Sequence, residues 1–342
     1  SAFGASDSEW QDWRWQLRHS VRTLEQLEQL LSLDPSERLA FSHAASLFSF
    51  EVSPYYLSLM ETNNPNHPLR RSMIPRTSEH VTSTAERADP LAEDQYRPAR
   101  GIVHRYADRA LFLATGRCAA YCRYCTRSRI VGDPKSLQTR KSMWIEAIDY
   151  ISRHPEIRDV LISGGDPLTL PDADLDWLLE QLAGIQHLDL LRIGTKIPAV
   201  LPMRVTTDLV HALTRHRKVW LSLHFTHADE LTPMAIEAVE RLADAGLPLG
   251  SQTVLLKGIN DDVGVLDTLF RRLMRHRVRP YYLYQCDPIP GSEHFRVDLV
   301  EGLAIAQTLR SQISGYGIPA YVLDLPGTDG KFPLLEADAI RL

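Results

Sequence analysis

The stretch ALFLATGRCAAYCRYCTRSR, residues 110–129, joins a short apolar run to a loop that contains three cysteines. Further apolar runs of strand length, separated by amphipathic segments, follow at residues 159–163, 190–194, 219–225, 251–256, 280–285 and 320–325. Strands that alternate with helices are typical of a parallel sheet with helical crossovers. Since no Gly-x-Gly-x-x-Gly fingerprint is present, the runs favour a barrel-like sheet over a dinucleotide-binding fold. We therefore predict an α/β fold built on a partial TIM-type (β/α) barrel.

Polar residues of functional types follow these runs. The cysteines come after the first run, Gly164 and Asp166 come after the second, and Asp287 follows the run at 280–285. His224 lies near the end of its own run. In a parallel barrel the carboxyl ends of the strands share one face, and catalytic residues gather there. The repetition predicts an active site at that face.

The first hundred residues differ from the rest of the chain. Residues 10–33 have apolar side chains at helical spacing, which predicts an amphipathic helix docked on the main domain. Residues 75–100 are polar and contain three prolines, so we expect an extended segment that wraps the molecule. We divide the chain into a helical and wrapping segment, residues 1–100, and a barrel core, residues 101–342.

Two of the amphipathic segments carry clear helix signals. The segment WIEAIDYI places Trp144, Ala147, Ile148 and Ile151 on one helix face. The segment MAIEAVERLADAG ends in Gly246, a residue type that is typical just beyond a helix C-terminus.

The composition excludes several classes of protein. The chain has 342 residues, 44% of them hydrophobic, and a net charge of −5 without a long basic tract, so we expect no nucleic-acid partner. No stretch approaches the roughly 20 apolar residues of a membrane span, and the first ten residues lack a signal-peptide pattern. Four cysteines are too few for a disulfide framework, and their clustering indicates metal or redox chemistry in the cytoplasm.

The cysteine loop has the spacing C-x3-C-x2-C, formed by Cys118, Cys122 and Cys125. Three kinds of site are compatible with it. Zinc would take the thiolates and a histidine. A ferredoxin-type cluster would need a fourth cysteine in another spacing. A four-iron cluster with three protein ligands would leave one iron open to a small molecule.

The loop, with Tyr124 before its last cysteine, and the segment SGGDP at residues 163–167 resemble the radical S-adenosylmethionine (SAM) enzymes. A closer resemblance, to the lysine 2,3-aminomutase family, covers nearly the whole chain. It is carried by the segments WQDWRWQ, SPYYLSLM, HRYADR, LHFTH, LPLGSQTVLLKGIND, RPYYLYQCD, GSEHFR and LDLPGTDGK. The resemblance implies a barrel of the radical SAM type with an N-terminal helical extension.

The resemblance implies three cofactors: a [4Fe-4S] cluster, SAM and pyridoxal 5′-phosphate (PLP). The three cysteines would hold the cluster, and Asp166 would accept the ammonium of SAM in place of the usual glutamate. The other residues matched to the SAM site are Tyr124, Ser163, Gly164, Gly165, His224 and Gln252. Lys331 matches the lysine that holds PLP covalently, and Arg105, Tyr106 and Arg109 match residues that contact it. The family has mostly glycine where this chain has Thr328 and Asp329, and an acid there would repel a nearby phosphate.

The resemblance also implies a substrate. Arg127 matches the residue that binds the substrate carboxylate, whereas Arg123 and Arg129 have no matched role and are expected to be solvated. Asp287 and Asp324 match two acids that hold the distal ammonium of lysine. Two carboxylates in one pocket favour a cation between them, so we expect lysine first and arginine second. We expect Cys286 not to be a cluster ligand, because SAM needs an open iron.

The implied activity is that of an isomerase that moves the amino group from C2 to C3 of L-lysine and gives β-lysine. An arginine 2,3-aminomutase, or a mutase whose β-lysine is attached to elongation factor P, is an alternative within the same class. A non-catalytic zinc-binding scaffold is an alternative from another class, but it leaves Lys331 and the paired acids unexplained. The implied partners are the amino acid and an electron donor such as flavodoxin or ferredoxin, and the resemblance allows a homo-oligomer.

Overall fold

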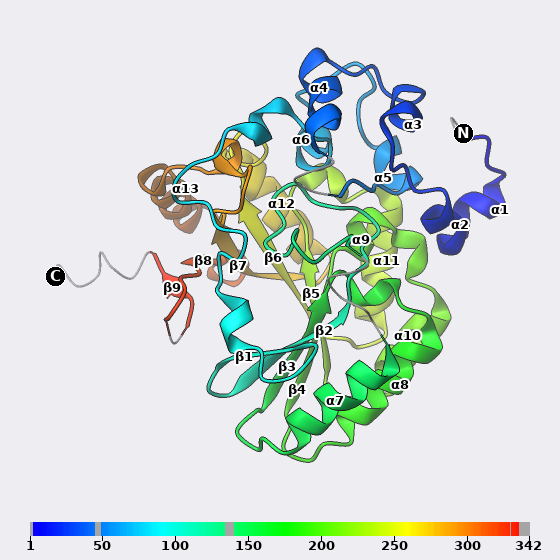
Figure 1. The fold of residues 1–342 in the computed structure, drawn as a ribbon, viewed down its shortest axis with the longest axis vertical. Helices are drawn as coiled ribbons and strands as arrows, with labels where there is room; N and C mark the ends of the chain where they lie inside the picture. The colour runs from blue at the N-terminus through cyan, green and yellow to red at the C-terminus, as the bar shows by residue number, and fades with distance from the viewer. Residues whose placement is uncertain (1–2, 45–48, 134–139, 329, 335–342) are drawn as a thin grey trace.

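The computed structural model describes residues 3–44, 49–133, 140–328 and 330–334, and these form one mixed sheet with helices around it (Figure 1). The strands of the described chain are β1 (Ile102–Tyr106), β2 (Arg109–Thr115), β3 (Asp159–Gly164), β4 (Leu190–Thr195), β5 (Val219–His224), β6 (Leu249–Leu255), β7 (Arg279–Gln285), β8 (Ala320–Leu323) and β9 (Phe332–Pro333). They lie in the sheet in sequence order. Strands β2 to β8 pair in parallel, and β1 and β9 add to the two edges in antiparallel orientation.

The predicted fold class is confirmed, because every predicted apolar run forms a parallel strand and helices connect successive strands. Among the described strands β1 does not pair with β9, so the barrel is open, as a partial barrel should be. The antiparallel β1 and β9 were not predicted. The connecting helices are α7 (Lys141–Ser152), α8 (Asp172–Ala183), α9 (Ile197–Val200), α10 (Thr207–Thr214), α11 (Pro233–Asp244), α12 (Val263–Arg275) and α13 (Leu299–Gln312).

The helix signals in the core are confirmed. In α7, Trp144, Ala147 and Ile151 are buried against the sheet, and Ile148 is half-buried beside them. Helix α11 ends at Asp244, and Gly246 follows with a φ of +83°. A left-handed φ strains any residue with a Cβ, which explains why glycine stands at this position.

The single amphipathic helix expected at residues 10–33 is wrong. The segment forms α1 (Asp7–Gln11), α2 (Trp13–Arg18) and α3 (Leu24–Glu28). Asp12 has extended backbone angles between the first two helices, and its side chain accepts a hydrogen bond from the Arg14 amide at 2.9 Å. A short side chain that caps the backbone competes with helix continuation, and here it divides the helix.

The N-terminal helices lie against the carboxyl ends of the strands. The helices that follow α3 are α4 (Pro35–Ala44), α5 (Pro54–Ser58) and α6 (Pro68–Met73). Val52 bridges to Ala120 after β2, the Ser53 hydroxyl donates to the carbonyl of Val200 after β4 at 2.6 Å, and Tyr56 donates to Glu230 at 2.7 Å. Figure 1 shows α3 to α6 gathered at one end of the sheet. The division at residue 100 stays a prediction. Trp13 and Leu27, which precede it, belong to the same buried cluster as Ile162 of β3.

Residues 75–100 contain neither strand nor α-helix in the structure, which describes all of them. They cross the strand ends, where the Arg87 amide donates to the Pro288 carbonyl at 2.8 Å. The 3₁₀ helices are η1 (Thr77–His80), η2 (Glu93–Tyr96), η3 (Pro167–Thr169), η4 (Pro202–Arg204), η5 (Ala228–Glu230), η6 (Glu293–Phe295) and η7 (Gly315–Gly317). None of the helices in the described chain has the length and apolar character that a membrane span requires.

Candidate active site at the carboxyl ends of the strands

One cavity of about 360 Å³ lies at the carboxyl ends of the parallel strands. All of the predicted site residues line it. The cavity therefore brings together residues that are more than 200 positions apart in the sequence, such as Arg105 and Lys331. The predicted site residues are Arg105, Tyr106, Arg109, Cys118, Cys122, Tyr124, Cys125, Arg127, Ser163, Gly164, Gly165, Asp166, His224, Gln252, Asp287, Asp324 and Lys331. Their individual roles remain predictions.

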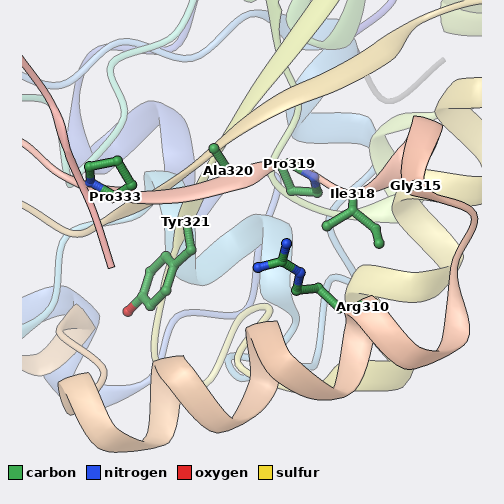
Figure 2. Close-up of a pocket in the computed structure, with 7 residues that line it drawn as sticks. All are labelled: Arg310, Gly315, Ile318, Pro319, Ala320, Tyr321 and Pro333. Carbon is green, nitrogen blue, oxygen red and sulfur yellow. The ribbon is translucent and has the colours of Figure 1, made fainter. Parts of the chain in front are cut away.

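A second cavity, of about 260 Å³, lies between α13 and β8 (Figure 2). Its lining comprises Arg310, Gly315, Ile318, Pro319, Ala320, Tyr321 and Pro333. Among the described residues of this lining, Arg310 is the only ionised side chain, and neither a thiol nor a carboxylate accompanies it. We therefore place the site in the larger cavity.

The three cysteines enter the larger cavity from the loop after β2. Burial raises the pKa of all three thiols, that of Cys122 to about 11. Thiols of this kind ionise when a metal lies beside them, so the donor set fits a metal centre. In the described part of the chain no group of three or more His, Cys, Asp or Glu side chains is arranged to hold a metal ion. Three thiols alone fit a cluster that spreads its ligands over several irons better than they fit one zinc ion.

Cys286, the fourth cysteine, belongs to an apolar cluster against which Cys122 packs. It is 2% exposed and packs in an apolar cluster with Tyr124, Leu256 and Phe295. It does not line the cavity, and burial raises its pKa strongly. That Cys286 is not a cluster ligand stays a prediction.

The Gly-Gly loop is held against the cysteine loop by backbone contacts. A Cβ at Gly164 would lie 2.3 Å from the Thr115 carbonyl oxygen, and one at Gly165 would lie 2.3 Å from that of Arg117. The Gly165 amide donates to Thr115 at 2.6 Å. Both glycines are therefore required by the close approach of two chain segments, and this reason does not depend on a cofactor.

Asp166 follows these glycines and is 6% exposed. Its carboxylate accepts hydrogen bonds from the Thr195 hydroxyl at 2.8 Å and from the Lys196 amide at 2.7 Å. Burial raises its pKa to about 6 although these bonds favour the ionised form. A carboxylate held in this way at the cavity wall can receive a ligand cation.

Tyr124, His224 and Gln252 form the neighbouring wall. The Tyr124 hydroxyl lies 3.1 Å from Nε2 of His224 and 2.7 Å from the Thr226 hydroxyl, and the Tyr124 and His224 rings are stacked. Burial, with the charge of Lys196, keeps the pKa of His224 well below its usual range, so the ring is neutral. Gln252 lies opposite His224 in the register of β5 and β6.

Sequence analysis assigned no role to Lys196, which lines the same wall. Its Nζ lies 2.6 Å from Oε1 of Glu230 and 3.1 Å from the Thr226 hydroxyl, and the residue is 9% exposed. Lys196 directly follows β4, so the strand-end argument that selected Asp287 also applies to it. Its position at a strand end could therefore have identified it, but a single lysine is usually a surface residue.

The opposite side of the cavity surrounds Lys331. Its Nζ lies 3.0 Å from Oδ2 of Asp324 and 5.6, 6.0 and 5.6 Å from the ring centroids of Tyr106, Tyr282 and Tyr284. Tyr282 and Tyr284 were not predicted to belong to the site. Anionic and aromatic groups together stabilise the lysine cation. Asp329 lies outside the described residues.

Two arginines beside Lys331 fit an anionic cofactor. Arg105 and Arg109 lie over the Tyr106 ring, with Cζ 5.1 and 4.6 Å from its centroid, and Nη1 of Arg105 lies 3.0 Å from Asp324. The Nε atoms of both arginines are buried without a hydrogen-bond partner among the described residues, although that of Arg109 lies 3.5 Å from Oδ1 of Asp108. Buried donors of this kind fit the oxygens of a phosphate, so the residues present fit PLP.

The two predicted acids have different surroundings. Asp324 is engaged by Arg105 and Lys331, whereas Oδ1 of Asp287 is buried and has no hydrogen-bond partner in the described chain. Burial, and after it the charge of Asp324, raises the pKa of Asp287 to about 7. An unpartnered buried carboxylate fits a cationic ligand.

The arginines of the cysteine loop are all paired. Arg127 lies 2.7 Å from Oε1 of Glu93, which sequence analysis did not identify. The expectation that Arg123 and Arg129 are solvated is wrong. Arg123 is 1% exposed and its Nε donates to Glu79 at 2.9 Å, and Arg129 lies 3.1 Å from both Asp89 and Asp94. Their partners come from residues 75–100, so the wrapping segment decides their burial.

Known proteins resemble this chain over nearly its whole length. The model of the radical SAM superfamily matches residues 112–269. The L-lysine 2,3-aminomutase of Clostridium subterminale is 44% identical over 334 residues, which are 96% of this chain and 79% of that protein. The glutamate 2,3-aminomutase of Clostridioides difficile (strain 630) is 38% identical over 98% of this chain and 79% of its own. The crystal structure of Streptococcus suis SuiB superimposes with a TM-score of 0.50 at 14% identity, covering 64% of this chain and 49% of SuiB, and supports the fold alone.

Proposed function

Because the chain belongs to the lysine 2,3-aminomutase family of the radical SAM superfamily, we propose that it is an isomerase that converts L-lysine into β-lysine. The amino group would move from C2 to C3 while a hydrogen atom moves in the opposite direction. The observation that carries the proposal is the cavity itself. It joins three cysteine thiols, Lys331 and a buried carboxylate without a partner, and these are the groups that such a reaction needs in one place.

The family uses a [4Fe-4S] cluster, SAM and PLP. When bound, they supply a radical that abstracts hydrogen and a conjugated ring that spreads the unpaired electron. Cys118, Cys122 and Cys125 would hold the cluster. Asp166 would bind the ammonium of SAM, beside the wall formed by Ser163, Gly164, Gly165, Tyr124, His224 and Gln252. Arg105 and Arg109 would bind oxygens of PLP, Tyr106 would cover its ring, and Lys331 would hold it covalently.

The charged residues that line the cavity support lysine as the substrate. Arg127 would bind its carboxylate, and Asp287 and Asp324 would bind its distal ammonium. A glutamate side chain would bring a third carboxylate to the two acids and would be repelled. Arginine carries the same charge but a longer, planar group, and the substrate test below separates the two.

A radical SAM enzyme needs a reductant, and we propose a flavodoxin or ferredoxin as the electron donor. A cytoplasmic location and a homo-oligomer also stay proposals. The function is tested with protein that has been reconstituted and reduced without oxygen and is then given lysine, arginine, ornithine or glutamate. Lysine should be consumed fastest, with β-lysine as the product by chromatography. Faster conversion of any of the other three would overturn the substrate assignment.

A further inference from the structure

The guanidinium of Arg127 is held along one edge by Glu93. Oε1 of Glu93 lies 2.7 Å from Nη2 and 3.1 Å from Nε, and Oε2 lies 3.2 Å from Nε. The Glu93 side chain is 5% exposed and that of Arg127 is 18% exposed. A fork of this kind, shielded from water, fixes the direction of the whole planar group.

The other edge of the same guanidinium remains available. Arg127 has five N–H donors, and the described residues provide no hydrogen-bond partner for its Nη1. Arg127 and Glu93 both line the cavity. The edge formed by Nη1 and Nη2 can therefore bind a carboxylate within the cavity. Glu93 meanwhile stays hydrogen-bonded to the other edge, formed by Nε and Nη2.

Glu93 is itself fixed by its neighbours. It begins the 3₁₀ helix η2, and Oδ1 and Oδ2 of Asp89 accept hydrogen bonds from the amides of Glu93 and Asp94 at 3.0 and 2.8 Å. Ala92 before it has a φ of +53°, a left-handed conformation that is uncommon for a residue with a Cβ. Such a conformation persists where the surrounding contacts hold it.

The cavity gives Arg127 a competing partner. Asp287 lines the same cavity as Arg127, and its Oδ1 has no hydrogen-bond partner among the described residues. Opposite charges in a site shielded from water attract each other strongly, so an unrestrained Arg127 would turn towards this acid. That movement would remove the carboxylate site and the ammonium site together.

We propose that Glu93 is a positioning residue that holds Arg127 away from Asp287 and presents its Nη1–Nη2 edge to the carboxylate of the substrate. The inference rests on the proposed function only in requiring an α-amino acid as the substrate. Glu93 carries the same charge as the substrate carboxylate and repels it. Loss of the hydrogen bonds between Glu93 and Arg127 should nevertheless weaken substrate binding more than the removal of this repulsion strengthens it. A charge-assisted hydrogen bond contributes more than a partly screened interaction across the cavity.

The test is a double-mutant cycle on the reconstituted enzyme, read by calorimetric binding of lysine as well as by turnover. Glu93→Gln should weaken lysine binding about 10- to 100-fold, the range expected for the loss of one charge-assisted bond. In an Arg127→Met background the same change should alter binding less than about threefold, because the arginine it acts on is gone. Asp94→Asn is the matched control, since this neighbouring acid is exposed and pairs with Arg97 and Arg129, and it should bind lysine normally.

Iron content and circular dichroism show whether each variant folds. If Glu93→Gln does not fold, Glu93→Asp is the second variant. It keeps the negative charge, but its side chain is too short to hold Arg127 in the same position. It should weaken lysine binding when Arg127 is present and have little effect in the Arg127→Met background. Normal lysine binding by a folded Glu93 variant would refute the proposal. An equal loss with and without Arg127 would refute it too, because Glu93 would then act on the fold and not on Arg127. Wild-type turnover of another amino acid would overturn the proposed substrate alone, and the cycle would be repeated with that amino acid.

Discussion

Asp287 combines burial, a neighbouring acid and an unpartnered oxygen, and its pKa of about 7 makes it sensitive to pH. Burial is the largest cause of this pKa; Asp324 and Glu93 also raise it, whereas Lys331 and Arg127 lower it. A lysine ammonium binds the ionised form, so protons compete with the substrate below pH 7. The KM for lysine should fall as the pH rises from 6 to 8, by up to about tenfold per unit below 7. In Asp287→Asn this dependence should disappear, and a variant that keeps the wild-type profile would show that another group titrates.

With its raised pKa, Asp287 ionises at higher pH, which favours lysine binding but lowers the stability of the fold there. Since the native state raises the pKa of Asp287, ionisation of this acid destabilises the fold as the pH rises from about 4 through 7. Asp287→Asn should therefore raise the melting temperature at pH 8 while it weakens lysine binding. A site that keeps such an acid trades stability for function.

Lys331 lies 3.0 Å from Asp324 and is 22% exposed, whereas Lys196 is paired with Glu230 in the interior. Lys331 shares Asp324 with Arg105, and both line the cavity together with Arg109. Borohydride reduction of the PLP-loaded protein should therefore attach the cofactor to Lys331, and peptide mapping locates the adduct. An adduct on Lys196 or Lys257 would contradict the assignment.

Among the elements, β3 and the cysteine loop depend on each other through Gly165. A methyl group there would meet the Arg117 carbonyl at 2.3 Å and would push the strand end away from the loop. Gly165→Ala should lower the free energy of unfolding by about 1–3 kcal/mol and reduce the iron bound after reconstitution. Chemical denaturation and iron analysis measure the two effects.

Gly184→Ala supplies the control for this prediction. At the end of α8 the nearest atoms to a new Cβ are 3.5 Å away, which is an ordinary contact. This variant should stay within about 0.5 kcal/mol of wild type. If both variants behave alike, the close approach at Gly165 does not limit the cysteine loop.

For the whole molecule, the shared core predicts joint unfolding of the N-terminal helices and the barrel. Leu27 of α3 and Trp13 of α2 pack in the same cluster as strand residues, and Tyr56 donates to Glu230 beyond β5. Hydrogen exchange in increasing urea should therefore show peptides from residues 13–33 and 144–163 losing protection together. Loss of protection in the first peptide at lower urea would instead support the division at residue 100 as two separate units.

The parallel strands and the active face were predictable because their signals are local. An apolar run followed at once by Cys118, Gly164 or Asp287 is visible in a few residues, and the parallel sheet then brings those ends together. The division of residues 10–33 at Asp12 was missed although its signal is also local, because apolar spacing outweighed a single capping residue. Strand β1 was not predicted, because HRYADR was assigned to cofactor contacts, whereas its first three residues also form the end of this strand.

The sequence by itself determined the positions of the parallel strands, the cysteine spacing and the residue types at the strand ends, since each follows from neighbours along the chain. Only the tertiary structure decided which acidic side chain pairs with which basic side chain. Glu93 faces Arg127, Glu79 faces Arg123, and Asp324 faces Lys331 and Arg105. Most of these partners are tens to hundreds of residues apart, and no periodic pattern selects one acid over another. Their pairing depends on burial, because a charge shielded from water needs a partner within a few ångströms, and the packed fold alone decides which partner lies there.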